Sequence, residues 1–491
     1  MKRILKYITA LGLSSVLYTS CNKGFLDYPP ETSISDATAF DQPYRIANQV
    51  LSLYSTLKGG TFYGGRYIVY GDIRANDFLL EDPNLVTNAD VWSLNPTNSA
   101  NAVVGLWAQA YGVINNCNLF IDGMEAKGLS VVGTTLGNNY LGEAKLIRAL
   151  SFYSLLQYYA RPYPDGNGAK LGLPLRLVGI KGPGASDLQR STVAEVYTQI
   201  IADLDFAEAN LPLTYGNAYT MTTRAHKNTA IALKTRVYLS MRDYPKVISE
   251  ANKVVPATAP FVASSGVANA LEADITNVFK APYTTKESIF SLPFTTTGGD
   301  IPGTQNGLQA YYYAAASGLG SIFSLNPAGI IGDAGWTAVD KRRSYIFTAP
   351  PAATNAGKKY WTKYPIASPA DYSPVIRWSE VLLNLAEAKV RSTNTIDAQA
   401  VALLNAVRNR SDATTTYTVG SFATAAALIT AIMTERRIEF LGEGLRNNDI
   451  MRLLEPIPAK GSAGAKAPGD EGYIWPASSN EKSLNKLWVD N

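Results

Sequence analysis

The sequence predicts a mainly α-helical fold with a loop-rich, irregular layer and few short strands. Apolar residues recur at helical spacing in five stretches, at 138–160, 191–210, 226–255, 373–411 and 422–453. Two other stretches, 59–97 and 256–372, are rich in Gly, Pro, Ser, Thr and aromatic residues and lack that period. The composition agrees, because 46% hydrophobic and 17% charged residues suit a large folded body.

The N-terminus has the layout of an export signal. A short basic head is followed by the mostly apolar residues 4–18, and no acidic residue precedes Asp27. This apolar run is too short to span a bilayer, and it ends in YTSC, which resembles a bacterial lipobox. We therefore expect residues 1–20 to be a lipoprotein signal peptide and Cys21 to be lipidated. The alternatives are cleavage nearby without lipid, or retention of the segment as a helix.

The charge, cysteine and histidine content limits the ligands and partners that this chain can have. The chain has 44 Lys and Arg against 40 Asp and Glu, and three of the bases lie in the signal, so no nucleic-acid partner is expected. Once Cys21 carries lipid, Cys117 is the one remaining cysteine, and we expect it in the core without a disulfide. The single histidine, His226, excludes a multi-histidine metal site and is interpreted as a surface or capping residue. We expect no cofactor; whether calcium steadies a loop is left open.

Start and stop signals bound several of the predicted helices. Thr192 and Glu195 have capping-box spacing at the start of one apolar stripe. Pro162 ends the helix before it. Ser373 and Pro374 suit the N-cap and the first turn of a later helix.

The stretch 226–255 predicts a helical hairpin. Its two apolar stripes are separated by the short break RDYP, and 373–411 repeats the arrangement. Two antiparallel helices joined by a few residues are the unit of tetratricopeptide-like stacks. Since each unit buries its stripe only against its neighbours, we expect a helical-hairpin superhelix.

Charged residues concentrate near the C-terminus, in ERRIEFLGEGLRNND. Paired carboxylates invite an acid–base interpretation, but a general acid needs a raised pKa. Arginines alternate with Glu439, Glu443 and Asp449 here, which predicts i,i+3 and i,i+4 pairing and a depressed carboxylate pKa. We expect a structural salt-bridge network in this segment, and the same role for Arg377, Glu380 and Glu387.

Six motifs follow one another along almost the entire chain: FLDYPPE, WAQAYGVINNCNLFID, GEAKLIRALSFYSLLQYY, VIRWSEVLLNLAEA, LLNAVRNRS and ERRIEFLGEGLRNNDIMR. Together they resemble the SusD/RagB family of outer-membrane nutrient-binding lipoproteins. The segment IWPASSNEKSLNKLW is looser than the family pattern. Asn22, Lys23 and Gly24 replace the acidic group that often accompanies surface export in this family.

The resemblance implies one SusD-like domain over residues 21–491. Its helical scaffold would cover about 32–58, 98–255 and 373–453, with ligand-facing loops at about 59–97 and 256–372. It implies a non-catalytic lipoprotein on the outer membrane, facing the exterior. Such a protein captures oligosaccharides and passes them to a SusC-like TonB-dependent barrel. The alternatives are a peptide-binding member of the family, a surface glycoside hydrolase or a protein-binding scaffold.

Candidate ligand-binding residues lie in the two loop-rich stretches. Sugar rings stack their CH faces on aromatic rings, and their hydroxyls exchange hydrogen bonds with Asn, Asp and Arg. The candidates are Arg74, Asn76, Asp77 and Trp92 in the first stretch, and Tyr311, Tyr312, Tyr313 and Trp336 in the second. For each of them, the alternative is that the side chain packs the loops onto the scaffold.

Overall fold

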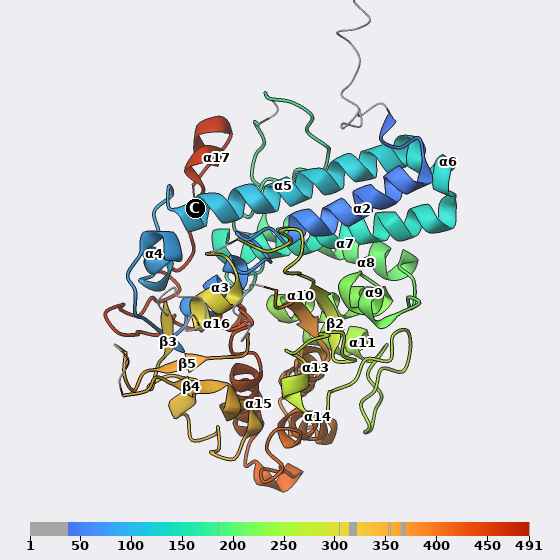
Figure 1. Cartoon of the computed structure of the whole chain (residues 1–491). Coiled ribbons are helices and arrows are strands. Elements are labelled where there is room, and N and C mark those ends of the chain that lie inside the picture. Colours follow the sequence, from blue (N-terminus) through green and yellow to red (C-terminus); the bar gives the residue numbers. More distant parts are fainter. Residues whose placement is uncertain are drawn as a thin grey trace, which may run out of the picture.

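A computed structural model describes residues 38–184, 186–303, 305–313, 322–351, 353, 355–364 and 370–490. The predicted signal peptide and Cys21 lie outside the described residues. Long helices stack across the top, the right and the lower centre of the molecule, and the short strands β3, β4 and β5 gather at the lower left (Figure 1). The predicted mainly α-helical fold with few short strands is confirmed.

Long helices pack in sequence in the N-terminal half. Helix α7 (Thr134–Tyr159) lies between α5 (Asn101–Gly123) and α8 (Val193–Asn210), and α2 (Pro43–Leu57) packs on both α5 and α7. Because α7 has neighbours on several sides, its C-terminal two-thirds is buried almost all round.

The C-terminal half continues the stack. Helix α10 (Lys227–Met241) forms the predicted hairpin with α11 (Tyr244–Ala251), and both pack on α13 (Trp378–Thr393). Helix α13 in turn contacts α14 (Ala398–Asn409) and α15 (Ala425–Glu439).

Two more helices and several short elements complete the chain. Helix α16 (Arg446–Leu453) packs on α3 (Arg66–Ile73). This contact brings a C-terminal segment against an N-terminal one. The short helices are α4 (Ala89–Trp92), α6 (Leu129–Val132), α9 (Ala218–Thr223), α12 (Leu308–Tyr312) and α17 (Ser479–Leu484), with a π-helical turn at Met124–Gly128. The 3₁₀ turns are Leu85–Thr87, Ile275–Asn277, Ile330–Gly332, Lys341–Tyr345 and Val419–Ser421.

The strands form three antiparallel pairs. Strand β1 (Phe78–Leu80) pairs with β3 (Phe323–Leu325), and β4 (Ile346–Thr348) pairs with β5 (Lys359–Trp361). Strands β3 and β5 also contact each other, so these two pairs lie together (Figure 1). The third pair joins β2 (Ser288–Leu292) to β6 (Ser373–Arg377).

Local signals placed several helix ends correctly. The Thr192 hydroxyl accepts a hydrogen bond from the Glu195 backbone N–H at 3.2 Å, and the Thr192 N–H donates to the Glu195 carboxylate at 2.7 Å. This reciprocal capping box is confirmed. In the RDYP break, the Asp243 carboxylate accepts from the Lys246 N–H and begins α11.

Two sequence expectations need correction here. Ser373 and Pro374 do not start a helix; they begin strand β6, and α13 starts only at Trp378. The β-branched Val375 and Ile376 suit a buried strand paired with β2. The stretch 59–97 is also less irregular than expected, because it contains α3, β1 and α4.

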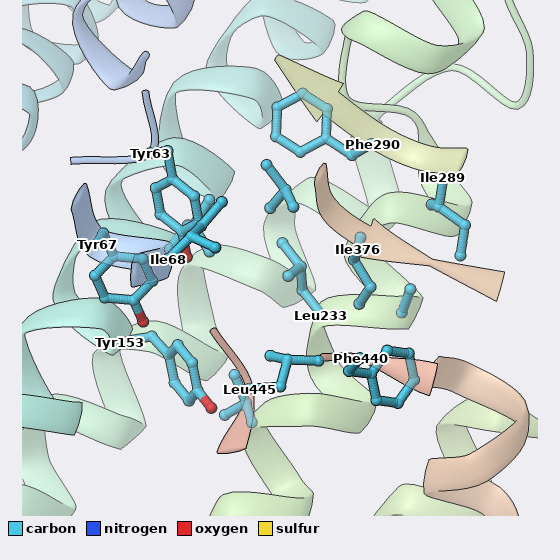
Figure 2. Packing of buried hydrophobic residues seen from close by; sticks show 14 of the residues in the cluster. Tyr63, Tyr67, Ile68, Tyr153, Leu233, Ile289, Phe290, Ile376, Phe440 and Leu445 are labelled. Carbon is cyan, nitrogen blue, oxygen red and sulfur yellow. The ribbon is translucent and has the colours of Figure 1, made fainter. Parts of the chain in front are cut away.

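Tyrosines make up much of the core. Tyr63 and Tyr67, near the start of α3, lie in one cluster with Tyr153 of α7 and Phe290 of β2 (Figure 2). Their buried hydroxyls have partners: Tyr63 lies 3.0 Å from the Ser154 hydroxyl, and Tyr153 lies 2.9 Å from that of Ser240. The abundance of tyrosine therefore serves the core as well as any surface.

Cys117 and the single histidine, His226, are both buried. Cys117 is free and buried, as predicted. His226 occupies the N-cap position of α10, but it is not at the surface, because its ring is buried with Nε2 3.1 Å from the Ile289 carbonyl oxygen. Burial lowers the pKa of His226 to about 4, so the ring is neutral at pH 7.

Candidate binding site

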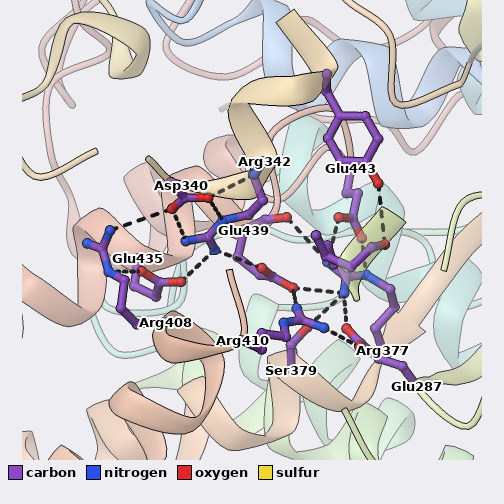
Figure 3. Close-up of polar contacts among 12 residues, drawn as sticks. Glu287, Asp340, Arg342, Arg377, Ser379, Arg408, Arg410, Glu435, Glu439 and Glu443 are labelled. Atoms are coloured by element: carbon purple, nitrogen blue, oxygen red, sulfur yellow. Dashed lines mark hydrogen bonds and ion pairs between the residues drawn. The ribbon is translucent and has the colours of Figure 1, made fainter. Parts of the chain in front are cut away.

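The predicted salt-bridge network exists, and it is buried (Figure 3). Arg377 donates to both carboxylate oxygens of Glu443, at 2.8 and 2.7 Å, and to Glu439 at 2.9 Å. Arg342 reaches the opposite oxygen of Glu439 at 2.9 Å. Further members, whose side chains are at most 6% exposed, are Glu287, Asp340, Lys363, Arg408, Arg410 and Glu435.

These carboxylates are ionised. Burial alone would raise the pKa of Glu439, but Arg410, Arg377 and Arg342 hold it well below its usual range. Arg377 and Lys363 outweigh burial in the same way and lower the pKa of Glu443. A general acid needs the opposite shift, so the geometry gives this cluster a structural role.

The pairing pattern differs from the local one that the sequence suggested. Arg436 does not pair with Glu439 one turn away; it forms a 3.1 Å ion pair with Asp449 of α16. Glu439 and Glu443 instead bind arginines from distant segments. Helix α15 ends at Glu439, and Gly442 and Gly444 follow with φ of 86° and 76°, a conformation open to glycine.

Three predicted ligand residues in the first loop-rich stretch are buried. Arg74 donates to the Tyr473 carbonyl at 2.5 Å. Asp77 accepts from Arg437 at 2.6 Å and from the Ile330 N–H at 2.8 Å. The Trp92 indole N–H donates to the Phe78 carbonyl at 2.9 Å.

Three candidates in the second stretch are buried too. The Tyr311 hydroxyl donates to the Gln305 carbonyl and that of Tyr312 to Asp72, each at 2.6 Å. Trp336 packs edge-to-face on Trp361, with ring centroids 6.1 Å apart. All six residues are at most 5% exposed, which fits the alternative that their side chains pack the loops onto the scaffold. They hold the irregular layer together, and their contact with a ligand stays a prediction.

Asn76 and Tyr313 are the candidates that remain half-buried. The Tyr313 ring lies edge-to-face against Phe347 of β4, with centroids 5.2 Å apart. Phe347 faces Tyr360 across the β4–β5 pair, and alternation places Lys358 on the same face.

Lys358 forms an ion pair with Glu81, which directly follows β1. We call Glu81, Tyr313, Phe347 and Lys358 the strand-edge site. The Lys358 side chain is 46% exposed and that of Glu81 14%, so both are within reach of solvent. The site thus combines an aromatic pair with an exposed ammonium and a largely buried carboxylate, which also accepts from the Ser324 hydroxyl. Groups of these kinds suit the CH faces and hydroxyls of a sugar.

Phe347 and Lys358 were not among the sequence candidates. Phe347 lies on the three-residue strand β4 and Lys358 directly precedes the three-residue strand β5, so their common face depends on the pairing of β4 with β5. A three-residue run carries almost no periodic signal, so the sequence alone gave little reason to select them.

An aromatic groove on the helical side is a less suitable site. It lies between α5 and α17, has a volume of about 330 Å³ and is lined in part by Trp107 and Tyr111. Its polar groups are engaged, as those of the strand-edge site are, but they are less exposed: the Tyr111 hydroxyl donates to the Pro174 carbonyl, and Arg176 pairs with Glu481 at 3.1 Å, with side chains 13% and 10% exposed against 46% for Lys358. These contacts fasten the adjacent loop and the C-terminal segment to α5.

Burial raises the pKa of three described carboxyl groups, Asp72, Asp90 and Glu143, which is the direction that acid catalysis requires, and the shift is largest at Asp72. Burial raises the pKa of Asp72 to about 8, despite hydrogen bonds from the Tyr312 hydroxyl and the Gly444 N–H. The cavity beside it, which Asp77 and Asp449 also line, has a volume of only about 10 Å³. That is about the space of one water, so a sugar ring does not fit.

No group of three or more His, Cys, Asp or Glu side chains within the described ranges is arranged to hold a metal ion. Likewise, none of the helices that the structure describes has both the length and the apolar character needed to cross a membrane.

Comparison with known proteins identifies this architecture. A family model described as starch-binding and associating with the outer membrane matches residues 24–239, and the SusD family model matches residues 334–486. A crystal structure of a SusD superfamily protein from Bacteroides fragilis is 32% identical, with a TM-score of 0.80, and the match covers 91% of this chain and 99% of that one. The helical hairpins and irregular layer of this chain therefore form the fold of the SusD superfamily.

The chain belongs to the SusD family. SusD-like protein P2 of Formosa agariphila is 26% identical over 397 residues, which is 72% of each chain. A laminarin-binding SusD-like protein shares the fold, with a TM-score of 0.69 at 18% identity over 92% of this chain and 99% of that one. SusD family proteins are carbohydrate-binding proteins associated with the outer membrane.

Proposed function

We propose that this protein is a non-catalytic lipoprotein of the outer cell surface. It captures oligosaccharides and passes them to a SusC-like TonB-dependent transporter in the same membrane. Membership of the SusD family is the observation that carries this proposal. Lipid on Cys21, after removal of residues 1–20, would hold residues 21–491 as one domain at the membrane.

The strand-edge site is the proposed place of capture. Tyr313 and Phe347 offer ring faces and edges for the CH groups of a pyranose. Glu81 accepts and Lys358 donates hydrogen bonds, so the two together match both roles of a sugar hydroxyl.

Binding without cleavage fits the charged groups. The carboxylates of the central network are ionised and buried, and the protonated Asp72 borders a cavity of one-water size. A glycosidase needs two carboxyl groups about 5–10 Å apart on either side of an accessible bond.

Titration calorimetry with malto-oligosaccharides and laminarin oligosaccharides tests capture, and an assay for new reducing ends on the same samples tests cleavage. The proposal expects heat of binding to at least one glycan and no new reducing ends. Reducing ends would show a hydrolase. Binding of peptides but not glycans would show a peptide-binding member of the family.

Two variants test the site. Tyr313→Ala and Phe347→Ala are each expected to weaken glycan binding by about 1–3 kcal/mol, which is roughly 5- to 150-fold. Tyr219→Ala is the matched control, because Tyr219 is 51% exposed on the separate helix α9. Unchanged affinity in both site variants would show that the glycan binds elsewhere on the protein, but it would not contradict glycan capture itself.

The anchor and the transporter are tested separately. Cys21→Ser is expected to release the protein from the membrane fraction, because the lipid would be its attachment. Affinity purification of the lipidated protein from detergent-solubilised outer membranes is expected to recover a TonB-dependent barrel. Recovery of the protein alone would contradict the transfer step.

A further inference from the structure

A groove runs along the helical side of the molecule, between α2, the end of α5 and the π-helical turn. Its volume is about 560 Å³. Phe40, Leu53, Leu119 and Phe120 contribute its apolar wall, and Lys181 stands at its rim. In Figure 1 these helices lie at the top of the molecule, and the β3, β4 and β5 strands of the strand-edge site lie at the lower left.

The first described residues are fastened to this groove. The Thr38 carbonyl accepts from Arg45 at 2.9 Å, and that of Ala39 accepts from Gln49 at 2.7 Å, both on α2. The Phe40 ring packs on Phe120, with centroids 5.9 Å apart, and against Gly123, where an added Cβ would lie 2.0 Å from the ring. The chain before Thr38 therefore starts at the groove's edge.

We propose that residues 25–28, Phe-Leu-Asp-Tyr, dock in this groove. Tyr28 precedes Thr38 by ten residues, and up to about 35 Å of extended chain can carry it anywhere along the groove. These four residues form the densest apolar block between Cys21 and Thr38, and the groove wall is apolar. Asp27 complements Lys181, which has no ion-pair partner in the part of the chain that the structure describes.

Docking would set the distance between the body and its anchor. This consequence rests on the proposed lipid at Cys21, although the docking itself does not. Phe25 follows Cys21 by four positions, a reach of about 14 Å, whereas the undocked segment from Cys21 to Thr38 reaches about 60 Å. The groove side of the body would then lie nearest the anchor.

Limited proteolysis tests the docking on the mature chain in its lipid-free Cys21→Ser form. Chymotrypsin cleaves after Phe25 and Leu26 only where the segment is undocked, and mass spectrometry follows the loss of the N-terminus. Ser52→Trp and Ser52→Arg each place a large side chain in the groove from an exposed position on α2. Ser55→Trp is the matched control, exposed on the same helix but outside the groove.

The proposal expects both Ser52 variants to be clipped at least tenfold faster than the wild type and Ser55→Trp to match the wild type. Two results overturn it. One is clipping of the wild type at the rate of a free peptide of the same sequence. The other is a Ser52 variant, with unchanged melting temperature, that is clipped no faster than Ser55→Trp. Since the assay contains neither glycan nor lipid, its outcome is independent of the proposed capture.

Discussion

Replacing Glu439 by Gln removes the carboxylate at the centre of the ion network. Glu439 is 1% exposed and pairs with Arg342, Arg377 and Arg410. The Gln side chain keeps the shape of Glu, but an NH₂ donor replaces one of the two carboxylate oxygens. That donor would face guanidinium groups, which need acceptors. Removing one partner of a buried ion pair costs about 3–5 kcal/mol, and we expect a loss of that size in the free energy of unfolding.

Urea denaturation followed by far-UV circular dichroism at pH 7 measures this loss. Lys482→Met is the control, because it removes an ion pair with Asp490 whose side chains are 37% and 60% exposed. Its expected cost is less than about 1 kcal/mol. A loss below about 1 kcal/mol for Glu439→Gln as well would refute the reasoning, since it would mean that the network rearranges freely around a missing charge.

The same variant has a predicted pH signature. The pKa of Glu439 in the folded protein lies well below its unfolded value, so the unfolded chain takes up the proton first on acidification. The carboxylate's contribution is fully present above the unfolded pKa of about 4.3 and is lost as the pH falls further. The stability difference between wild type and Glu439→Gln is therefore expected to shrink below about pH 4.

Three further variants test individual groups. Because burial raises the pKa of Asp72 to about 8, the wild type should lose stability relative to Asp72→Asn as the pH rises from 5 to 8 in urea denaturation; parallel curves would contradict this. Because burial lowers the pKa of His226 to about 4, the single imidazole NMR signal should not titrate above pH 5, and titration near pH 6.5 would contradict its burial. The wild type should lose stability as the pH falls from 6.5 to 4, and His226→Asn should reduce that loss. Thr192→Ala should cost about 1 kcal/mol in thermal unfolding by removing a capping box, whereas the mid-helix control Thr198→Ala should not.

Features that depend on neighbouring residues could be predicted from the sequence. The capping box needs only Thr192 and Glu195, and the α10–α11 hairpin needs only the stripes on either side of RDYP. The structural role of the charged segment also followed from its composition, because arginines among carboxylates keep the carboxylates ionised wherever their partners come from.

Features that depend on distant partners could not be predicted. Residues 373–377 form a strand because β2, more than 80 residues earlier, lies beside them. Glu439 binds Arg342, Arg377 and Arg410, which lie on three separate segments, so no local spacing could identify them. Trp92 and Trp336 lie in loop-rich stretches without helical or strand periodicity. In such stretches the neighbouring residues do not indicate whether an indole is buried or exposed, and both proved to be buried.

Tyr312 and Tyr313 show how finely the binding surface is determined. Tyr312 is the last residue of α12, and its hydroxyl turns inward to Asp72. At Tyr313 the backbone is extended, with φ of −152°, and the ring meets Phe347 on the strand edge. The end of α12 thus separates a core tyrosine from a candidate ligand contact, and the register of β4 on β5 adds Lys358 to the same face. A change that extended α12 by one residue, or shifted that register by one, would dismantle the strand-edge site while leaving the helical stack intact.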